Sequence, residues 1–506
     1  MLLVLVIVAF AALALLALYG RFAVRPGGVT SVAFDTQGNA LSLDRAVSPL
    51  IARHDGKTGL RLVTDNVEAF ALRAAAARRA ERSLDLQYYY WKHDLTGGLL
   101  AREVIAAADR GVRVRLLLDD VNAWGRDTNY RALDRHPNIE VRLFNPLRCR
   151  EGVLLRGIEM VLRFWSVNRR MHHKAWIADG RVLMIGGRNI GDAYFDAAEA
   201  SNFRDMDVLA LGPAVRQAEL VFDSYWNSAV VAPIRDLPDW LARAELGLFR
   251  RRLEKLFASG HGDDYLNAAD KAMDELVAEA GMHWCGGAEV VSDPPEKALS
   301  NEADGWLLRR ILPVIASAKQ SLQITSPYFI PLDSGARLLA NLAGAGVSIS
   351  VLTNSLAATD VTAAYGAYMR FRKPLLAAGV RLFELRARGG RKDVSLFGSR
   401  GASLHTKAFV VDGTKGFVGS FNFDPRSVSL NTEMGLFFDH AGLAREMQAV
   451  FSAETAAKHS FRLAMDGDRV VWRDGELAPA EQEPDAGVGR RLMAGAVSLL
   501  PLESQL

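Results

Sequence analysis

The sequence has few cysteines and no excess of charge of one sign. Only two cysteines occur among 506 residues, Cys149 and Cys285, and they do not form a CxxC pair. A disulfide framework and a cysteine zinc site are therefore excluded, and we expect two reduced thiols. Basic side chains number 61 against 58 acidic ones, for a formal net charge of +3. That balance argues against a protein that binds nucleic acid through its charge.

Long hydrophobic runs are also scarce, with one exception near the start. Residues 2–19 are uninterruptedly apolar, and as a helix they reach about 27 Å, close to the thickness of a bilayer core. A cleaved signal peptide is the alternative, but no basic residue precedes the run, whereas Arg21 and Arg25 follow it. We therefore expect an uncleaved transmembrane anchor with the main body on the cytoplasmic side.

The chain repeats itself. Residues 83–89, 111–117 and 141–144 are echoed in the same order by residues 321–328, 346–352 and 380–383. Short Val/Ile/Leu-rich runs alternate with helical patterns of roughly 10 to 15 residues, which is typical of α/β units around a buried sheet. A duplication in order and spacing predicts two similar α/β lobes.

The chain divides into six expected parts. Half of the residues are apolar, which excludes disorder and leaves enough for a core in each lobe. The apolar residues of 488–500 recur at helical spacing, so this helix lies either in a membrane interface or on the protein core. We expect an anchor over 1–20, a linker over 21–45, lobe 1 over 46–250, a helical connector over 251–290, lobe 2 over 291–465, and a tail over 466–506 with a C-terminal amphipathic helix.

One pattern, H-x-K-x4-D followed by Gly and Asn, is written twice. A chain of this length and composition contains about 0.03 such matches by chance, so two in register are specific. The two copies, each member displaced by 233 residues, are His172, Lys174, Asp179, Gly186 and Asn189, and then His405, Lys407, Asp412, Gly419 and Asn422.

The spacing predicts a hairpin in each copy. Residues i and i+2 of a strand share a face, so His172 and Lys174 project together while His173 faces the opposite layer and is read as structural. Asp179 and Asp412 each precede Gly, a strong turn signal. We therefore expect the two aspartates to lock the hairpins at the end remote from the histidines rather than to contact phosphate.

If the lobes face each other about a pseudo-twofold axis, two His, two Lys and two Asn surround one pocket. Such a pocket suits a phosphodiester: Lys174, Lys407, Asn189 and Asn422 would stabilise developing negative charge, and Gly187 and Ser420 would let backbone approach the phosphate. One histidine would attack phosphorus and the other would protonate the leaving oxygen, without metal or cofactor. The residues alone do not say which histidine does which.

Two acids after the motifs are predicted to orient the imidazoles. Glu433 and Asp207 each precede an apolar run, the place where a partner for an imidazole is expected. Asp205 is equally well explained as a surface acid without a role. The aromatic residues 88–91 form either a core wall or a contact for a lipid.

The duplicated pattern resembles the phospholipase D superfamily from about residue 46 to 465. The resemblance implies two α/β/α sandwich lobes with one active site between them and a covalent phosphohistidine. In relatives the nucleophile is commonly the first-motif histidine, which implies His172 as nucleophile and His405 as general acid.

Residues 138–146, 186–195, 419–427 and 431–435 are similar to bacterial cardiolipin synthases of the C type. This resemblance implies transfer of a phosphatidyl group to phosphatidylglycerol, with phosphatidylglycerol or phosphatidylethanolamine as donor, at the bacterial inner membrane. The implied partners are phospholipids and the membrane, with no nucleic acid; no motif identifies an activating protein. One departure is Ser420, which stands where the first copy has Gly187, so the lobes are not equivalent.

Three alternatives share parts of the pattern. A phospholipase D would give the phosphatidyl group to water and release phosphatidic acid, and acceptor choice depends on how the site excludes water, which no motif reports. A nuclease of the same superfamily is disfavoured by the low net charge and the hydrophobic run. An inactive lipid-binding or scaffold module is disfavoured because both motifs are complete.

Overall fold

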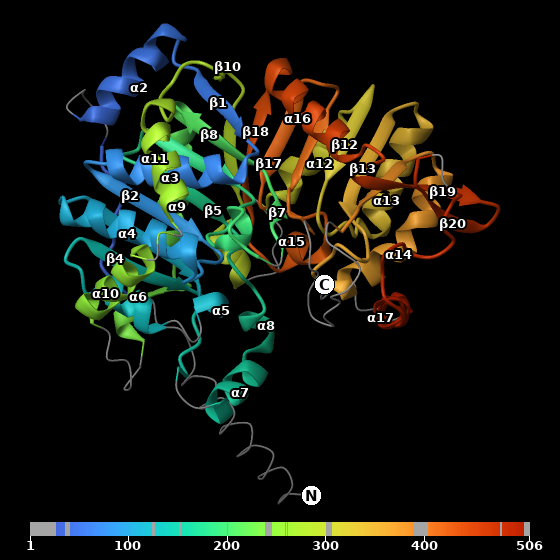
Figure 1. Cartoon of the computed structure of the whole chain (residues 1–506). Coiled ribbons are helices and arrows are strands. Elements are labelled where there is room, and N and C mark those ends of the chain that lie inside the picture. Colours follow the sequence, from blue (N-terminus) through green and yellow to red (C-terminus); the bar gives the residue numbers. More distant parts are fainter. Residues whose placement is uncertain are drawn as a thin grey trace, which may run out of the picture.

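The computed structural model describes residues 27–35, 41–123, 127–150, 153–199, 201–237, 245–258, 260, 262–299, 306–387, 403–475 and 478–499. Figure 1 shows two α/β lobes side by side, one from the first half of the chain and one from the second. Each lobe is built around a nine-stranded mixed sheet. The prediction of two α/β lobes is confirmed.

The sheet of the first lobe is parallel from β2 through β3 to β4 and antiparallel at every other neighbouring pair. Its strands, in spatial order, are β10 (His283–Cys285), β1 (Thr58–Val63), β8 (Asp207–Leu211), β6 (Val182–Gly186), β5 (Lys174–Ala178), β2 (Ser83–Tyr88), β3 (Arg113–Asp119), β4 (Ile139–Phe144) and β9 (Val231–Pro233).

The sheet of the second lobe is parallel from β12 through β13 to β14 and antiparallel elsewhere. Its strands, in spatial order, are β11 (Glu289–Ser292), β18 (Met434–Asp439), β17 (Lys415–Gly419), β16 (Ala408–Val411), β12 (Ser321–Thr325), β13 (Ser348–Asn354), β14 (Arg381–Leu385), β19 (Ser460–Asp466) and β20 (Arg469–Arg473).

Seven strands correspond between the sheets. The run β8-β6-β5-β2-β3-β4-β9 matches β18-β17-β16-β12-β13-β14-β19 in order and in the direction of every pair. The sequence echoes thus reflect a true structural repeat. The segment expected to be a helical connector does contain helices, but it also supplies β10, whose pairing with β1 places it at the edge of the first sheet.

Helices cover the outer face of each sheet and fill the space between the sheets. The helices, in chain order, are α2 (Ser42–Arg53), α3 (Asn66–Arg79), α4 (Leu95–Asp109), α5 (Asp120–Ala123), α6 (Asp127–Asp134), α7 (Val153–Leu162), α8 (Phe164–Val167), α9 (Pro213–Trp226), α10 (Leu246–Phe257), α11 (Asp263–Glu275), α12 (Leu308–Ala316), α13 (Leu332–Gly344), α14 (Thr362–Ala377), α15 (Pro425–Ser429), α16 (Ala441–Glu454) and α17 (Val488–Ser498), with single 3-10 turns at η1 (Asp192–Tyr194), η2 (Ile234–Asp236) and η3 (Pro295–Ala298).

Two helices join the lobes. Helix α9 contacts β5, β6 and β8 of the first sheet and β11 of the second, and α16 contacts β1 as well as β12, β16 and β17. Together with the facing strands they enclose a central core that includes Ile185 and Val208 from one half and Val418 and Leu436 from the other. Burying apolar surface across the lobe boundary fixes the lobes relative to each other.

The ends of the chain bear on membrane attachment. The predicted transmembrane helix over residues 2–19 lies outside the described residues, and among the residues that are described no helix is long and apolar enough to cross a membrane. Helix α17 docks on α14 through one face: Ala494 is fully buried, and its carbonyl lies 2.6 Å from where a Cβ on Gly366 would stand. On its other face, Val488 and Leu492 are 69% and 70% exposed.

Candidate active site

The two motif hairpins form as expected from their sequence. β5 and β6 pair through a turn at Asp179-Gly180, and β16 and β17 pair through a turn at Asp412-Gly413. All four turn residues have φ between 50° and 68°, a conformation that Asp and Gly adopt more readily than other residues. His172 and His405 lie just before β5 and β16, at the end of each hairpin opposite the turn.

The motif aspartates fix the hairpins to a neighbouring strand. Asp179 accepts hydrogen bonds of 2.7–3.2 Å from the backbone N–H groups of residues 81–83, at the start of β2. Asp412 accepts equivalent bonds of 2.8–3.2 Å from residues 319–321, at the start of β12. Both carboxylates therefore act on the backbone at the end of the hairpin remote from the histidine.

The histidine of each lobe is held by backbone of the other lobe. The N–H of His172 donates to the carbonyl of Thr432 at 2.9 Å, and the N–H of His405 donates to the carbonyl of Arg204 at 2.8 Å. Around His405 this pairing extends into a two-stranded parallel sheet of β7 (Phe203–Arg204) and β15 (Ser403–Leu404). The two contacts are equivalent under the repeat, and they cross the lobe boundary in opposite directions.

The same crossing brings an acid to each imidazole. Glu433, which follows Thr432, has Oε2 at 2.9 Å from Nδ1 of His172. Asp205, which follows Arg204, has Oδ2 at 2.6 Å from Nδ1 of His405. Since both partners are carboxylates, each Nδ1 carries the proton and donates, and each Nε2 presents its lone pair.

Asp207, one of the two acids predicted from the sequence to orient the imidazoles, contacts neither of them. Its carboxylate is fully buried at the start of β8, 2.8 Å from Nη2 of Arg73 and 3.3 Å from Nη1 of Arg188. The acid at His405 is Asp205 instead. The sequence contained a signal for this, because Asp205-Met206 matches Glu433-Met434 as an acid followed by methionine, whereas Asp207 precedes valine.

Gly187 and Ser420, predicted to approach phosphate, are placed against these acids. A Cβ on Gly187 would lie 2.1 Å from Oδ1 of Asp205, so only glycine leaves room for that carboxylate. Ser420 occupies the equivalent position and donates its hydroxyl to Glu433 at 2.5 Å. The difference between the two copies is therefore a difference in how the orienting acid is held.

Glu433 has more hydrogen-bond donors than Asp205. Besides His172 and Ser420, Ser427 Oγ donates to its Oε1 at 2.8 Å. Burial alone would raise the pKa of Glu433, but His172, Lys174 and Ser420 outweigh it and lower this pKa to about 2. Burial dominates at Asp205 and raises the pKa of its carboxyl, against the effect of Lys407. Glu433 is thus the more firmly ionised of the two acids.

Both histidines are neutral at neutral pH. Burial lowers the pKa of His172 to about 4, opposed by Glu433 and assisted by the lysines of both motifs. Burial also lowers the pKa of His405 well below its usual value, and Lys407 and Lys174 act in the same direction. Because each histidine responds to the lysines of both lobes, the two motifs form one electrostatic unit.

The motif lysines and asparagines lie beside the histidines. Lys174 Nζ donates to the carbonyl of His172 at 2.5 Å, and Lys407 Nζ donates to the carbonyl of His405. Burial lowers the pKa of Lys407 to about 8. Asn189 donates to the Tyr194 hydroxyl at 2.9 Å, and within the described chain the buried Oδ1 atoms of both motif asparagines have no hydrogen-bond donor.

Aromatic rings line the approach to the histidines. Tyr89 packs edge-on against His172, with ring centroids 5.1 Å apart, and Tyr194 does the same against His405 at 5.2 Å. Both tyrosines line one cavity of about 260 Å³, together with Tyr90, Lys92, Asn189, Gly191, Ala193 and Phe203. Of the aromatic run, Tyr88 and Trp91 are instead buried in the first core, so the cavity wall comes from Tyr89 and Tyr90.

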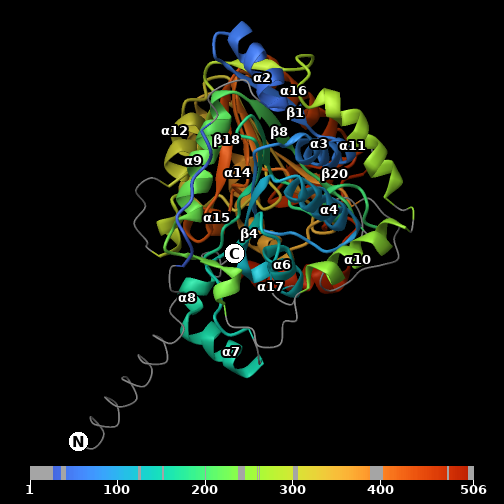
Figure 2. The same ribbon diagram turned by 90° about the vertical axis from the view of Figure 1, so that its left-hand side faces the viewer.

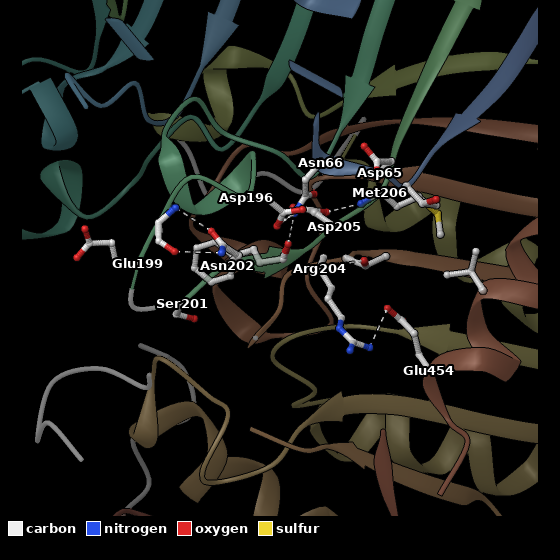
Figure 3. A pocket seen from close by; sticks show the side chains of 15 residues that line it. Asp65, Asn66, Asp196, Glu199, Ser201, Asn202, Arg204, Asp205, Met206 and Glu454 are labelled. Atoms are coloured by element: carbon white, nitrogen blue, oxygen red, sulfur yellow. Dashed lines mark hydrogen bonds and ion pairs between the residues drawn. The ribbon is translucent and has the colours of Figure 1, made fainter. Parts of the chain in front are cut away.

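A second, polar cavity of about 520 Å³ reaches Asp205 from the lobe boundary. In Figure 3 its wall is rich in acids, with Asp65, Asp196, Glu199 and Glu454 around Arg204. Arg204 and Glu454 form an ion pair at 3.9 Å, and burial raises the pKa of Glu454 to about 7. Over the described ranges no group of three or more His, Cys, Asp or Glu side chains is arranged to hold a metal ion.

Comparisons with known proteins agree with this geometry. A family model described as "Cardiolipin synthase, PLD-like domain" matches residues 74–226 and 311–455. The chain is 40% identical to cardiolipin synthase C of Escherichia coli over 91% of its own length and 99% of that protein's. It is 29% identical to a cardiolipin synthase of Geobacillus kaustophilus, over 74% of this chain and 62% of that one.

Among solved structures, the phosphatidylserine synthase of Haemophilus influenzae is similar, with a TM-score of 0.57. The match covers 92% of this chain and 100% of that one at 12% sequence identity. At that identity the likeness concerns the fold alone, and it supports two lobes of the same architecture.

Proposed function

This chain belongs to the phospholipase D-like cardiolipin synthase family and is a phosphatidyltransferase, and we propose that it makes cardiolipin through a phosphohistidine intermediate. The observation that carries the proposal is the crossed pairing of His172 with Glu433 and of His405 with Asp205. Each pair leaves one Nε2 free of its acid, and a double displacement at phosphorus requires two such groups, one to attack and one to transfer the proton.

We propose His172 as the nucleophile. An imidazole that attacks phosphorus gains positive charge, and a firmly ionised carboxylate at its Nδ1–H stabilises that charge. Glu433 fits this role, because three side-chain donors hold it in the ionised form. The first-motif histidine is also the usual nucleophile in the superfamily that the sequence resembles.

In the first step the Nε2 lone pair of His172 forms a bond to phosphorus of the donor phospholipid. The bond from phosphorus to the headgroup oxygen breaks, and that oxygen takes a proton from Nε2 of His405. His405 must therefore be protonated in the complex, although burial keeps it neutral in the free protein. The negative charge of the bound phosphodiester raises its pKa and supports this change.

In the second step a hydroxyl of phosphatidylglycerol attacks the phosphohistidine. His405 takes the hydroxyl proton, the P–N bond breaks and His172 is regenerated, leaving cardiolipin. Burial lowers the pKa values of both lysines, the negative charge of the bound phosphate opposes this effect, and the ammonium groups neutralise its nonbridging oxygens. The asparagines are assigned to the same oxygens.

We further propose phosphatidylglycerol or phosphatidylethanolamine as the donor, and the bacterial inner membrane as the location, with the catalytic body on the cytoplasmic side. The apolar run over residues 2–19 and the arginines that follow it support an anchor of that orientation. The relatives named as cardiolipin synthases support the lipid substrate.

The test uses the full chain in vesicles of labelled phosphatidylglycerol, with and without phosphatidylethanolamine, followed by mass spectrometry of the lipids. Cardiolipin is expected from the wild type and from a control variant, His54→Ala, whose ring pairs with Glu279 far from the site. It should be lost in His172→Ala and in His405→Ala. Phosphatidic acid without cardiolipin would instead indicate a hydrolase.

A second measurement assigns the nucleophile. A phospholipid whose leaving group needs no proton should still modify His405→Ala, and peptide mass spectrometry should find the phosphatidyl group on His172. His172→Ala should not be modified. Modification of residue 405 in the His172→Ala protein would reverse the assignment.

A further inference from the structure

Helices α7 and α8 carry their apolar side chains on the outside. Leu154 and Val161 are each 77% exposed, and Trp165 is 72% exposed. A surface helix of a globular protein normally shows the reverse pattern, with its apolar stripe turned to the core. The exposed apolar side chains of this segment, called the α7–α8 face from here on, are Leu154, Leu155, Ile158, Met160, Val161, Phe164 and Trp165.

The charged residues of the same segment are turned inward and bonded there. Glu159 is fully buried and accepts hydrogen bonds from the backbone N–H groups of Arg148 and Cys149 and from Arg163 at 2.7 Å. Arg163 also donates to the carbonyl of Pro146 at 3.0 Å. Turning the helices over would break these buried charge-assisted bonds, so the fold itself imposes the outward apolar face.

The α7–α8 face adjoins the active site. Helix α8 ends five residues before His172, and Asn145, which follows β4, donates to the carbonyls of Ser166 and Arg169 at 2.7 and 2.9 Å. Figures 1 and 2 show α7 and α8 projecting from the lower side of the molecule. Both views place α17, with its exposed Val488 and Leu492, toward the same side.

We propose that the α7–α8 face inserts into the surface of a bilayer that contains anionic phospholipid, and so presents the active site to its lipids. This inference rests on the proposed function, since a phosphatidyltransferase must reach a substrate that lies in a membrane. A bilayer is favoured over an apolar protein partner because the face adjoins the active site of a phosphatidyltransferase, and because Arg148 and Arg169, which flank the segment in the sequence, remain partly exposed to anionic headgroups. Trp165 suits the interface between headgroups and acyl chains.

The first experiment measures insertion locally, because any other membrane contact would bind the whole protein to vesicles. A fluorophore is attached at Val161→Cys in the full chain carrying Cys149→Ser; Cys285 is buried. The control probe is attached at Leu220→Cys on α9, an apolar position that is 55% exposed and lies away from the face. Vesicles of phosphatidylglycerol and phosphatidylethanolamine with brominated acyl chains should quench the probe at residue 161 and not the probe at residue 220.

The second experiment measures turnover. The triple variant Leu154→Asp, Val161→Asp and Trp165→Asp should make cardiolipin at least about tenfold more slowly in vesicles, and within about twofold of wild type in mixed detergent micelles, where substrate need not be drawn from a bilayer. The matched control, Leu220→Asp, Leu248→Asp and Leu312→Asp, also places three charges at exposed apolar sites. Its rate of cardiolipin formation should equal that of the wild type both in vesicles and in micelles.

Three results would overturn the proposal. The probe at residue 161 would not be quenched, or the triple variant would lose the same share of its cardiolipin-forming rate in vesicles and in micelles. The third is chemical cross-linking without lipid that joins the α7–α8 face to a second copy of the chain. Failure of the proposed function looks different. The wild type would then make no cardiolipin in either medium, while quenching at residue 161 would still establish the membrane-facing surface.

Discussion

Replacing Asp205 by asparagine should slow the reaction without unfolding the protein. The variant keeps the size of the side chain in a position where Gly187 leaves no spare room. It removes the negative charge at 2.6 Å from Nδ1 of His405. The backbone N–H of Met206, which donates to Oδ1 at 2.8 Å, can still be accepted by the amide oxygen, so the local backbone is retained.

The loss follows from the strength of the bond. A buried hydrogen bond to a charged acceptor contributes about 1.5–3 kcal/mol, and 1.4 kcal/mol is about tenfold in rate, so kcat should fall about 10- to 100-fold. The carboxylate stabilises the imidazolium, so its removal lowers the pKa of His405. The protonated form is then lost at lower pH, and the basic limb of the kcat profile should shift to lower pH.

The assay is cardiolipin formation in phosphatidylglycerol vesicles across a pH series, with kcat and KM measured separately. KM should change little, because Asp205 is assigned to His405 rather than to the lipid. The matched variant Asp207→Asn should behave differently, since breaking its buried pair with Arg73 costs about 3–5 kcal/mol of folding free energy. A kcat of Asp205→Asn within twofold of wild type, with an unshifted pH profile, would refute this account of the site.

Three further predictions concern the supporting residues. Asp179→Ala leaves three backbone N–H groups without an acceptor and should lower the free energy of unfolding by about 2–4 kcal/mol in urea titrations, whereas the more exposed Asp412→Ala should lose less than about 1.5 kcal/mol. The free energy of unfolding should fall as pH decreases from about 6.5 to about 4, because His172 takes up a proton in the unfolded chain that it does not take up in the folded protein. His172 accounts for about 3 kcal/mol of this fall. In the same urea titrations, the free energy of unfolding of His172→Asn should depend less steeply on pH. Gly187→Ala should displace Asp205 and reduce kcat about tenfold or more in the vesicle assay, and an unchanged rate would mean that the carboxylate has room to move.

The parts of the structure that depend on local pattern could be predicted from the sequence. Period-two alternation placed His173 on the face opposite His172, where its ring now packs against Tyr225 at 4.4 Å. The Asp-Gly pairs predicted both turns, and the 233-residue repeat predicted two matching sheets. These features arise from neighbours along the chain or from comparison of the chain with itself.

The parts of the site that depend on contacts between the lobes could not be predicted from the sequence. The sequence favours Asp207 over Asp205 because a strand-like apolar run follows Asp207 directly, and nothing local reveals that the carboxylate of Asp207 pairs with Arg73 and Arg188. Likewise, no pattern within one copy shows that Glu433 pairs with the histidine of the other copy. Each acid reaches the histidine of the other lobe because β7 pairs with β15 and Thr432 pairs with Met171 across the lobe boundary. These pairings depend on tertiary packing.

The exchange of acids has a consequence for how the enzyme could divide its two histidines. In a perfectly repeated pair of lobes the two imidazoles would be equivalent, and neither would be favoured as nucleophile. Here the repeat is broken at Ser420 and Gly187. Glu433 therefore gains a hydroxyl donor from Ser420, whereas Asp205 lies against Gly187, which has no side chain. A single position that contacts the orienting acid thus helps to make Glu433 the stronger anion, and this difference would favour charge separation at His172 and proton exchange at His405. Ser420→Gly should accordingly raise the pKa of Glu433 and slow formation of the phosphohistidine more than its hydrolysis or transfer, which rapid-quench measurement of the intermediate would detect; equal slowing of both steps would mean that Ser420 only supports the fold.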